Sequence, residues 1–229
     1  VALADIDHIE VLEGAASRLF GTSAFNGAIN IVTKKAKSEW VSASVEGGSF
    51  GSFGAQGRIQ TAFETGKWTQ AYSVSGGYKR SDGGTENSDF EKGQGYGNLS
   101  FSYDQRFDII AQLGIASQSY GANTFYSAKY NNQYEKTDHG LASLNLSLHN
   151  QEKTWEIAPQ FYYNKFKDHY QMIRGKAGAA AGENYHDLDV YGGGLNANVA
   201  WALGKTAVGF DISKECIYST ALGEELAEK

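Results

Sequence analysis

Alternation of apolar and polar residues along most of the chain constrains the fold more than any other feature. In residues 98–103, for example, Leu99, Phe101 and Tyr103 alternate with one asparagine and two serines. A period of two indicates β-strands with one apolar and one polar face. No helical period interrupts the pattern after residue 39. Nine strands are predicted, at residues 40–48, 54–63, 68–80, 94–104, 106–118, 140–149, 154–166, 189–203 and 206–217.

The connections between these strands alternate in length. After a tight turn at residues 49–52, short polar turns fall at 64–67, 103–106, 150–153 and 203–205, and long loops at 81–93, 119–139 and 167–188. Short turns at one end and long loops at the other are typical of antiparallel transmembrane β-barrels. Aromatic residues also gather near the predicted strand ends, as they do in girdles at the two membrane interfaces. A soluble β-sandwich is the alternative, although nothing in that fold requires loop lengths to alternate.

Composition narrows the class of protein further. The chain has 26 acidic and 20 basic residues and a formal net charge of −6, which argues against nucleic acid as a partner. No apolar run approaches the ~18 residues of a membrane-spanning helix, so a helical membrane protein is excluded. No nucleophile elbow, HExxH zinc motif or phosphate-binding P-loop is present. The sequence therefore predicts a protein that is not an enzyme and that needs no cofactor.

Residues 1–38 differ from the rest of the chain. Residues 7–14 are predicted to form a strand, residues 15–21 a helical turn closed by Gly21, and residues 28–33 a second strand. Such a unit is too short to enclose a hydrophobic core of its own.

The sequence of this first segment carries a family signature. Residues 6–21 (IDHIEVLEGAASRLFG) and 24–34 (AFNGAINIVTK) resemble the plug-domain motif of TonB-dependent outer-membrane receptors. The resemblance implies that residues 1–38 are the C-terminal part of a plug domain and that residues 39–229 are the N-terminal part of a transmembrane β-barrel. Barrels of this family have roughly 22 strands, which at ~10 residues each exceed the room available here. The chain is therefore expected to be a fragment, mainly β, with about nine antiparallel barrel strands.

The resemblance also predicts how the plug is held. Glu13 stands where the family commonly has an arginine that pairs with glutamates on the barrel wall. Arg18, about one helical turn further on, is a candidate to replace that arginine. Glu46 and Glu156 fall on the polar face of their strands and are its candidate partners. The alternative is that Arg18 is simply solvated.

The function implied by the resemblance is active uptake of a scarce nutrient across the bacterial outer membrane. The partners implied are TonB, through a segment expected before Val1, outer-membrane lipid, the nutrient ligand and a surface lipoprotein. The loops and the short plug-to-barrel junction resemble those of Bacteroidetes-type cobalamin receptors, so a corrinoid such as vitamin B12 is the first ligand predicted. A ferric siderophore or haem is the alternative within the family, and a passive porin-like barrel is the alternative outside it.

Aromatic and polar side chains in the long loops are the predicted ligand contacts, because such residues combine stacking with hydrogen bonding. These candidates are Tyr120, Asn123, Phe125, Tyr126, Tyr130, Tyr134, Tyr170, Arg174, Tyr185 and His186. The alternative role for the tyrosines is packing of the loops against one another.

The first long loop is acidic, and oxygen ligands in a flexible loop can hold Ca²⁺. The candidate calcium ligands are Asp82, Glu86, Asp89 and Glu91. A solvated acidic loop is the alternative.

Overall fold

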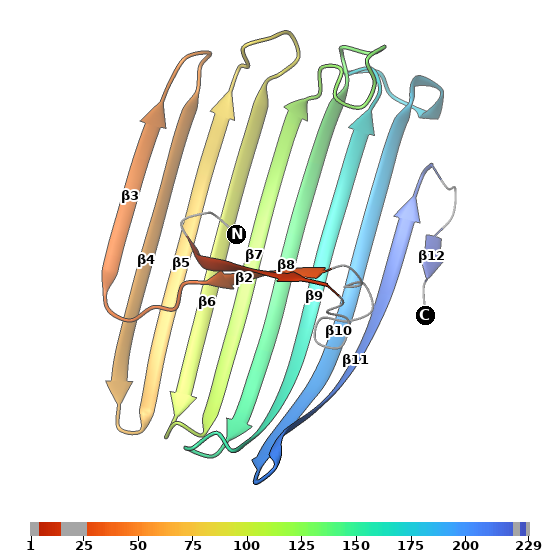
Figure 1. Cartoon of the computed structure of the whole chain (residues 1–229). Coiled ribbons are helices and arrows are strands. Elements are labelled where there is room, and N and C mark those ends of the chain that lie inside the picture. Colours follow the sequence, from red (N-terminus) through yellow and green to blue (C-terminus); the bar gives the residue numbers. More distant parts are fainter. Residues whose placement is uncertain (1–4, 15–26, 222–224, 228–229) are drawn as a thin grey trace.

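The computed structural model describes residues 5–14, 27–221 and 225–227. It consists of a two-stranded hairpin and one large antiparallel sheet, in which each strand pairs with the next along the chain (Figure 1). The hairpin is formed by β1 (Ile6–Glu13) and β2 (Gly27–Thr33). The helical turn predicted at residues 15–21 and the candidate Arg18 lie outside the described residues.

The large sheet confirms the nine predicted strands. They are β3 (Trp40–Gly47), β4 (Phe53–Thr65), β5 (Trp68–Ser81), β6 (Phe90–Tyr103), β7 (Phe107–Gly121), β8 (Tyr134–His149), β9 (Trp155–Gln171), β10 (Glu183–Trp201) and β11 (Gly204–Ser219). A tenth, three-residue strand, β12 (Glu225–Ala227), pairs with the end of β11, and a 3₁₀ turn, η2 (Ala179–Ala181), precedes β10. No helix in the described part of the chain is long and apolar enough to cross a membrane.

Several strands are longer than predicted, mostly toward the long loops, although β4 and β11 also gain two residues each toward the short turns. β6 begins at Phe90, β8 at Tyr134 and β10 at Glu183, whereas the alternation predicted starts at residues 94, 140 and 189. The long loops are correspondingly shorter, at residues 82–89, 122–133 and 172–182. We call this end of the sheet the loop end. The opposite end is the turn end, with the short turns at residues 66–67, 104–106, 150–154 and 202–203.

The turns at the turn end are tight because their residues accept unusual backbone angles. Asp104 and Gln105 both have positive φ, 52° and 54°, and the Arg106 amide donates to the Tyr103 carbonyl at 2.9 Å. Two consecutive residues with positive φ form the turn whose twist matches that of a two-stranded hairpin. This geometry lets β6 run directly into β7.

The two faces of the sheet differ in chemistry, as the alternation predicts. On one face Ile59 pairs with Val74 and both are about 60% exposed, at 62% and 63%. On the other face Arg58, Ser75 and Tyr96 are register neighbours, and all three are buried. We call these the outer and the inner face. The exposed apolar outer face is the kind of surface that a barrel presents to lipid.

Aromatic rings on the outer face mark the two borders of this apolar band. Toward the turn end, the Trp68 and Tyr103 rings lie 4.8 Å apart, and Trp155 begins β9. Toward the loop end, the Tyr163 and Tyr191 rings lie 5.0 Å apart. Trp155 and Tyr163 are eight positions apart in β9, which corresponds to about 27 Å along a strand and about 20 Å across a membrane at the usual tilt. The span between these two rings is therefore somewhat shorter than the ~25 Å apolar band of outer-membrane barrels, and the strands continue beyond it at the loop end.

The β1–β2 hairpin lies against the inner face and crosses the middle of the sheet in front of β5–β9 (Figure 1). Thr33, at the end of β2, contacts the side chains of Tyr96 on β6 and Gln112 on β7. The segment that follows β2 then leads to Trp40, where β3 begins. The plug-like sequence thus sits on the polar side of the sheet, where the lumen of a closed barrel would be.

Candidate functional site

Three tyrosines and a glutamate gather on the inner face at the loop end, and we call them the mouth cluster: Tyr120, Tyr126, Glu135 and Tyr170. Tyr120, Glu135 and Tyr170 are register partners on β7, β8 and β9, so their side chains form one row. Tyr126 reaches this row from the 122–133 loop. Its hydroxyl lies 3.0 Å from that of Tyr120 and donates a short hydrogen bond to the Glu135 carboxylate. Its ring meets the Tyr170 ring edge-on at 5.4 Å.

A second polar row lies directly below the mouth cluster. Thr137, Asp168 and His186 are register partners across β8, β9 and β10. Thr137 is only 3% exposed, and its hydroxyl and Asp168 Oδ1 are both buried without a hydrogen-bond partner among the described residues. Buried polar atoms normally have hydrogen-bond partners, so these two atoms are an unsatisfied pair beneath the mouth cluster. His186, a predicted ligand contact, belongs to this row.

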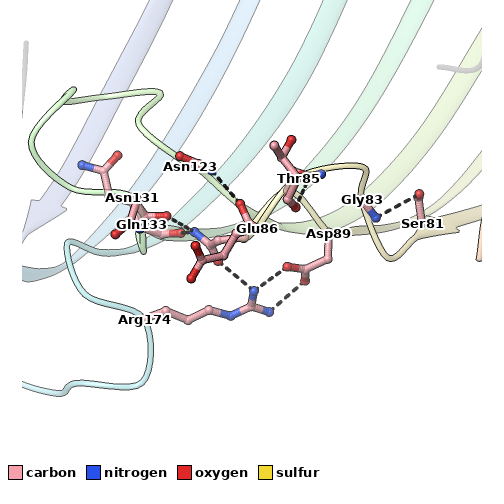
Figure 2. A network of polar contacts seen from close by, with 11 residues as sticks. Ser81, Gly83, Thr85, Glu86, Asp89, Asn123, Asn131, Gln133 and Arg174 are labelled. Atoms are coloured by element: carbon pink, nitrogen blue, oxygen red, sulfur yellow. Dashed lines mark hydrogen bonds and ion pairs between the residues drawn. The ribbon is translucent and has the colours of Figure 1, made fainter. Parts of the chain in front are cut away.

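The three long loops are tied together by the network in Figure 2, which we call the loop clasp: Asn87, Asp89, Gln133 and Arg174. The Arg174 guanidinium holds Asp89 with two bonds of 2.6 and 2.9 Å and also donates to Asn87 Oδ1 at 3.1 Å. The Asn87 amide donates in turn to the Gln133 carbonyl at 2.6 Å. The arginine beside Asp89 lowers the pKa of that carboxyl, and the Asp89 carboxylate raises the pKa of Arg174. A bidentate charged pair of this kind is among the stronger polar contacts in proteins.

The clasp shows what several predicted residues do in this structure. Arg174 is engaged with Asp89, and the Asn123 amide donates to the Glu86 carbonyl at 2.7 Å (Figure 2). Phe125 is 74% exposed in the 122–133 loop, with its ring edge-on to Tyr126. Tyr130 is in the same loop, with the Lys129 ammonium 5.6 Å from its ring. These residues build the loops around the mouth, and a role in ligand contact stays a prediction for each of them.

Two predicted residues lie on the opposite side of the sheet from the mouth cluster. Tyr134 and Tyr185 each stand one position away from an inner-face residue, Glu135 and His186, so their side chains point to the outer face. Their rings flank the His169 ring, with centroid distances of 6.2 Å for Tyr134 and 4.3 Å for Tyr185. This group belongs to the outer face above the apolar band. A ligand in the lumen would therefore meet the mouth cluster before it met these two tyrosines.

The candidate calcium ligands are not brought together. Asp89 is paired with Arg174, and Asp82 lies 3.2 Å from Arg80. Glu86 enters the network through its backbone carbonyl, and Glu91 lies in β6. The part of the chain that the structure describes contains no group of three or more His, Cys, Asp or Glu side chains arranged to hold a metal. The calcium prediction thus lacks a ligand set within these residues.

A mouth cavity of about 670 Å³ lies between the 82–89 and 122–133 loops. Phe90, Lys92, Gln118 and Tyr120 contribute inner-face side chains to it, and Asn123 and Phe125 contribute loop side chains. The cavity adjoins the mouth cluster through Tyr120. It is large enough for a small-molecule ligand, whose sites in proteins usually range from about 300 to 1,000 Å³.

The contact that fixes the hairpin to the sheet was not predicted from the sequence. We call it the plug–wall seam: Asp5, Arg58 and Ser75. Arg58 on β4 forms a short ion pair with Asp5, just before β1, and the Ser75 hydroxyl on β5 donates to the same carboxylate at 2.6 Å. Asp5 is 0% and Arg58 3% exposed. The partners lie 53 and 70 positions apart, and no local pattern relates positions so distant.

A second, neutral contact continues the attachment of the hairpin. The Thr33 hydroxyl accepts hydrogen bonds from Tyr96 and Gln112, both at 3.2 Å. Tyr96 and Gln112 are themselves joined at 2.8 Å, and Ser143 donates to Gln112 at 3.0 Å. The hairpin is therefore held to four neighbouring strands, β4 to β7, by polar side chains.

Glu46 and Glu156, the two predicted partners of Arg18, lie on the inner face, as expected. Both carboxylates are bonded to side chains of neighbouring strands of the sheet. Glu46 pairs with Lys79 at 2.7 Å. Glu156 accepts hydrogen bonds from Ser147 at 2.5 Å and from Asn198 at 2.9 Å. Since Arg18 is outside the described residues, its pairing with either glutamate stays a prediction.

Solved structures with the same fold are receptors and transporters. The siderophore receptor PiuA from Acinetobacter baumannii superposes with a TM-score of 0.73 at 15% identity, over 94% of this chain and 36% of its own. The copper transporter OprC gives a TM-score of 0.71 at 16% identity, over 97% and 36%. The ferric citrate transporter FecA gives 0.70 at 16% identity, over 100% and 38%. Neither a protein-family model nor a curated protein matches the sequence.

These likenesses establish the fold. The chain spans little more than a third of the length of the structures it matches. The resemblance to TonB-dependent outer-membrane receptors is thereby confirmed at the level of the fold, as is the prediction of an incomplete antiparallel barrel of the outer-membrane type.

Proposed function

We propose that this chain is part of an outer-membrane receptor that takes up a scarce nutrient with energy delivered through TonB. Residues 1–38 would be the end of the plug and residues 39–229 the first part of the barrel. The observation that carries the proposal is the seating of the β1–β2 hairpin on the inner face through a buried ion pair. A passive pore needs an open lumen, whereas a hairpin anchored inside the lumen obstructs it.

The proposed ligand is a metal chelate, with a ferric siderophore as the first candidate. The structures with this fold include a siderophore receptor, a ferric citrate transporter and a copper transporter. The mouth cluster offers three phenol rings, and the mouth cavity beside it has a volume that suits a small molecule. The corrinoid predicted from the loops finds no counterpart among these structures, so it enters the test below as the competing ligand.

In the proposed mechanism the ligand binds at the mouth and the plug then moves. The loop clasp keeps the three long loops in one arrangement, so that the mouth is preorganised for the ligand. Passage requires the plug–wall seam to open, and the energy for breaking a buried ion pair would come through TonB. A surface lipoprotein is a further proposed partner, on the outer side of the loops.

Uptake by the full-length receptor tests this proposal. Cells that carry the receptor as their only high-affinity route should accumulate ⁵⁵Fe-labelled siderophore with saturation, and a strain without TonB should lose that uptake. Cobalamin labelled with ⁵⁷Co, supplied in a parallel assay, decides between the two ligands. Uptake that never saturates and does not depend on TonB would support the passive porin instead.

A further inference from the structure

A second cavity lies between the hairpin and the wall of the sheet, midway along the inner face. Its volume is about 620 Å³. One side is formed by the start of β1 and the end of β2, another by the segment that joins β2 to β3, and the third by β3 and β4. The lining residues that matter here are Asp7, His8, Lys35, Lys37, Arg58 and Gln60.

The seam cavity is lined by more positive than negative side chains. Lys34, Lys35 and Lys37 line it together with one carboxylate, that of Asp7, while the charge of Arg58, which also lines it, is already paired with Asp5. Asp7 is itself hydrogen-bonded to His8 at 2.8 Å. Hydrogen bonds to Asp7 and Glu10 raise the pKa of His8, which favours its positively charged form. Like charges gathered around one cavity repel one another, so an anion between them would relieve the repulsion.

Arg58 adds a buried donor that is not fully used. Its Nη1 is paired with Asp5, and its Nε donates to Gln60 Oε1 at 3.3 Å. Nη2 is buried and has no acceptor among the residues that the structure describes. An arginine presents its donors in a planar fork that suits carboxylate and phosphate oxygens. An oxyanion in the cavity would give Nη2 an acceptor that the described residues do not supply.

We propose that the seam cavity binds a carboxylate or phosphate group of the transported ligand as it passes between plug and wall. Lys35 and Lys37 would supply the attracting charge, and Arg58 the directed hydrogen bond. This inference rests on the proposed function, because it places the site on the path of a ligand through the lumen. It makes the transported ligand an anionic chelate.

The test uses the purified full-length receptor in detergent, with inorganic phosphate and citrate as probes. Isothermal titration calorimetry at low salt gives the dissociation constant of each probe. The double variant Lys35→Gln/Lys37→Gln should bind both probes about tenfold more weakly or worse, and Lys35→Arg/Lys37→Arg should bind them as the unchanged receptor does. Lys153→Gln, in a turn-end loop outside the lumen, is the matched control and should leave binding unchanged.

Because this titration needs neither TonB nor uptake, it can fail separately from the proposed function. Equal affinity of the double glutamine variant and the unchanged receptor would overturn the inference, even where uptake proves TonB-dependent. Loss of affinity in Lys153→Gln to the same extent would also overturn it, since that result would mean diffuse attraction to any lysine. Binding of phosphate but not citrate would restrict the site to phosphate-bearing ligands and would overturn the carboxylate part of the proposal.

Discussion

Replacement of Arg58 by methionine should loosen the hairpin more than any other single change on the inner wall. Methionine keeps much of the length of the side chain but leaves the Asp5 carboxylate, which is 0% exposed, with Ser75 as its one remaining partner in the seam. Removing one member of a fully buried ion pair typically costs about 3–5 kcal/mol. No reduction for solvent screening applies, because Arg58 itself is 3% exposed.

Hydrogen exchange followed by mass spectrometry measures this loss in the full-length receptor. Amides of β1 and β2 exchange when the hairpin detaches, so a cost of 3–5 kcal/mol should speed their exchange roughly 150-fold to 5,000-fold. The double variant Arg58→Met/Asp5→Asn should recover part of the protection, because neither charge is then left unpaired. Lys79→Met is the matched control, since the Lys79–Glu46 pair lies on the same face but is 54% and 63% exposed. It should cost about 0–1 kcal/mol. Equal exchange in Arg58→Met and Lys79→Met would refute the claim that the seam anchors the hairpin.

Three further predictions concern the loops, the mouth and the outer face. The pKa of Asp89 is lowered, so the clasp is fully formed above the ordinary aspartate pKa of about 3.8 and is lost only as the pH falls through the lowered value. Protection of residues 82–89 from hydrogen exchange should therefore be constant from about pH 8 to 5. A decline of this protection within that range would contradict the assignment. Tyr126→Phe removes the hydroxyl that joins Tyr120 to Glu135 and should weaken ligand binding about five- to tenfold in calorimetry, whereas Tyr185→Phe on the outer face should not. Leu113→Lys, at an outer-face position that is 64% exposed, should destabilise the folded receptor by about 2–4 kcal/mol in urea titrations from lipid vesicles, and the inner-face change Ser100→Lys should be tolerated.

The sequence was sufficient to predict the sheet, because lipid on one side and a polar lumen on the other impose a period of two. This alternation is no longer required in the parts of the strands that extend beyond the apolar band. In β8 the alternation predicts a start at residue 140, but the strand begins at Tyr134. Beyond the apolar band both faces carry polar side chains, as Lys136 and Thr137 show, so backbone pairing continues without leaving a pattern in the sequence.

The mouth was predictable in composition but not in arrangement. Loops rich in tyrosine indicated Tyr120 and Tyr170, whereas Glu135, which accepts the hydrogen bond of Tyr126, has no distinguishing neighbours in the sequence. Extending the phase of β8 and β10 into the loops would have placed Tyr134 and Tyr185 on the outer face. The pairing of Asp5 with Arg58 could not be predicted from the sequence, since it depends on where the hairpin lies on the sheet.

The central claim is that the hairpin sits on the inner face and must leave it for uptake, and a disulfide tests this most directly. The chain has one cysteine, Cys216, which is free, and it is replaced by serine together with any cysteine in the rest of the receptor. In the full-length receptor in outer membranes, Asp5→Cys with Ser75→Cys should cross-link under mild oxidation, because the two side chains are in hydrogen-bond contact. The cross-link should abolish energised uptake, and reduction should restore it. Asp5→Cys with Val74→Cys, one position away but on the outer face, should not cross-link. Cross-linking to position 74 and not to position 75, or full uptake in the cross-linked receptor, would contradict the account.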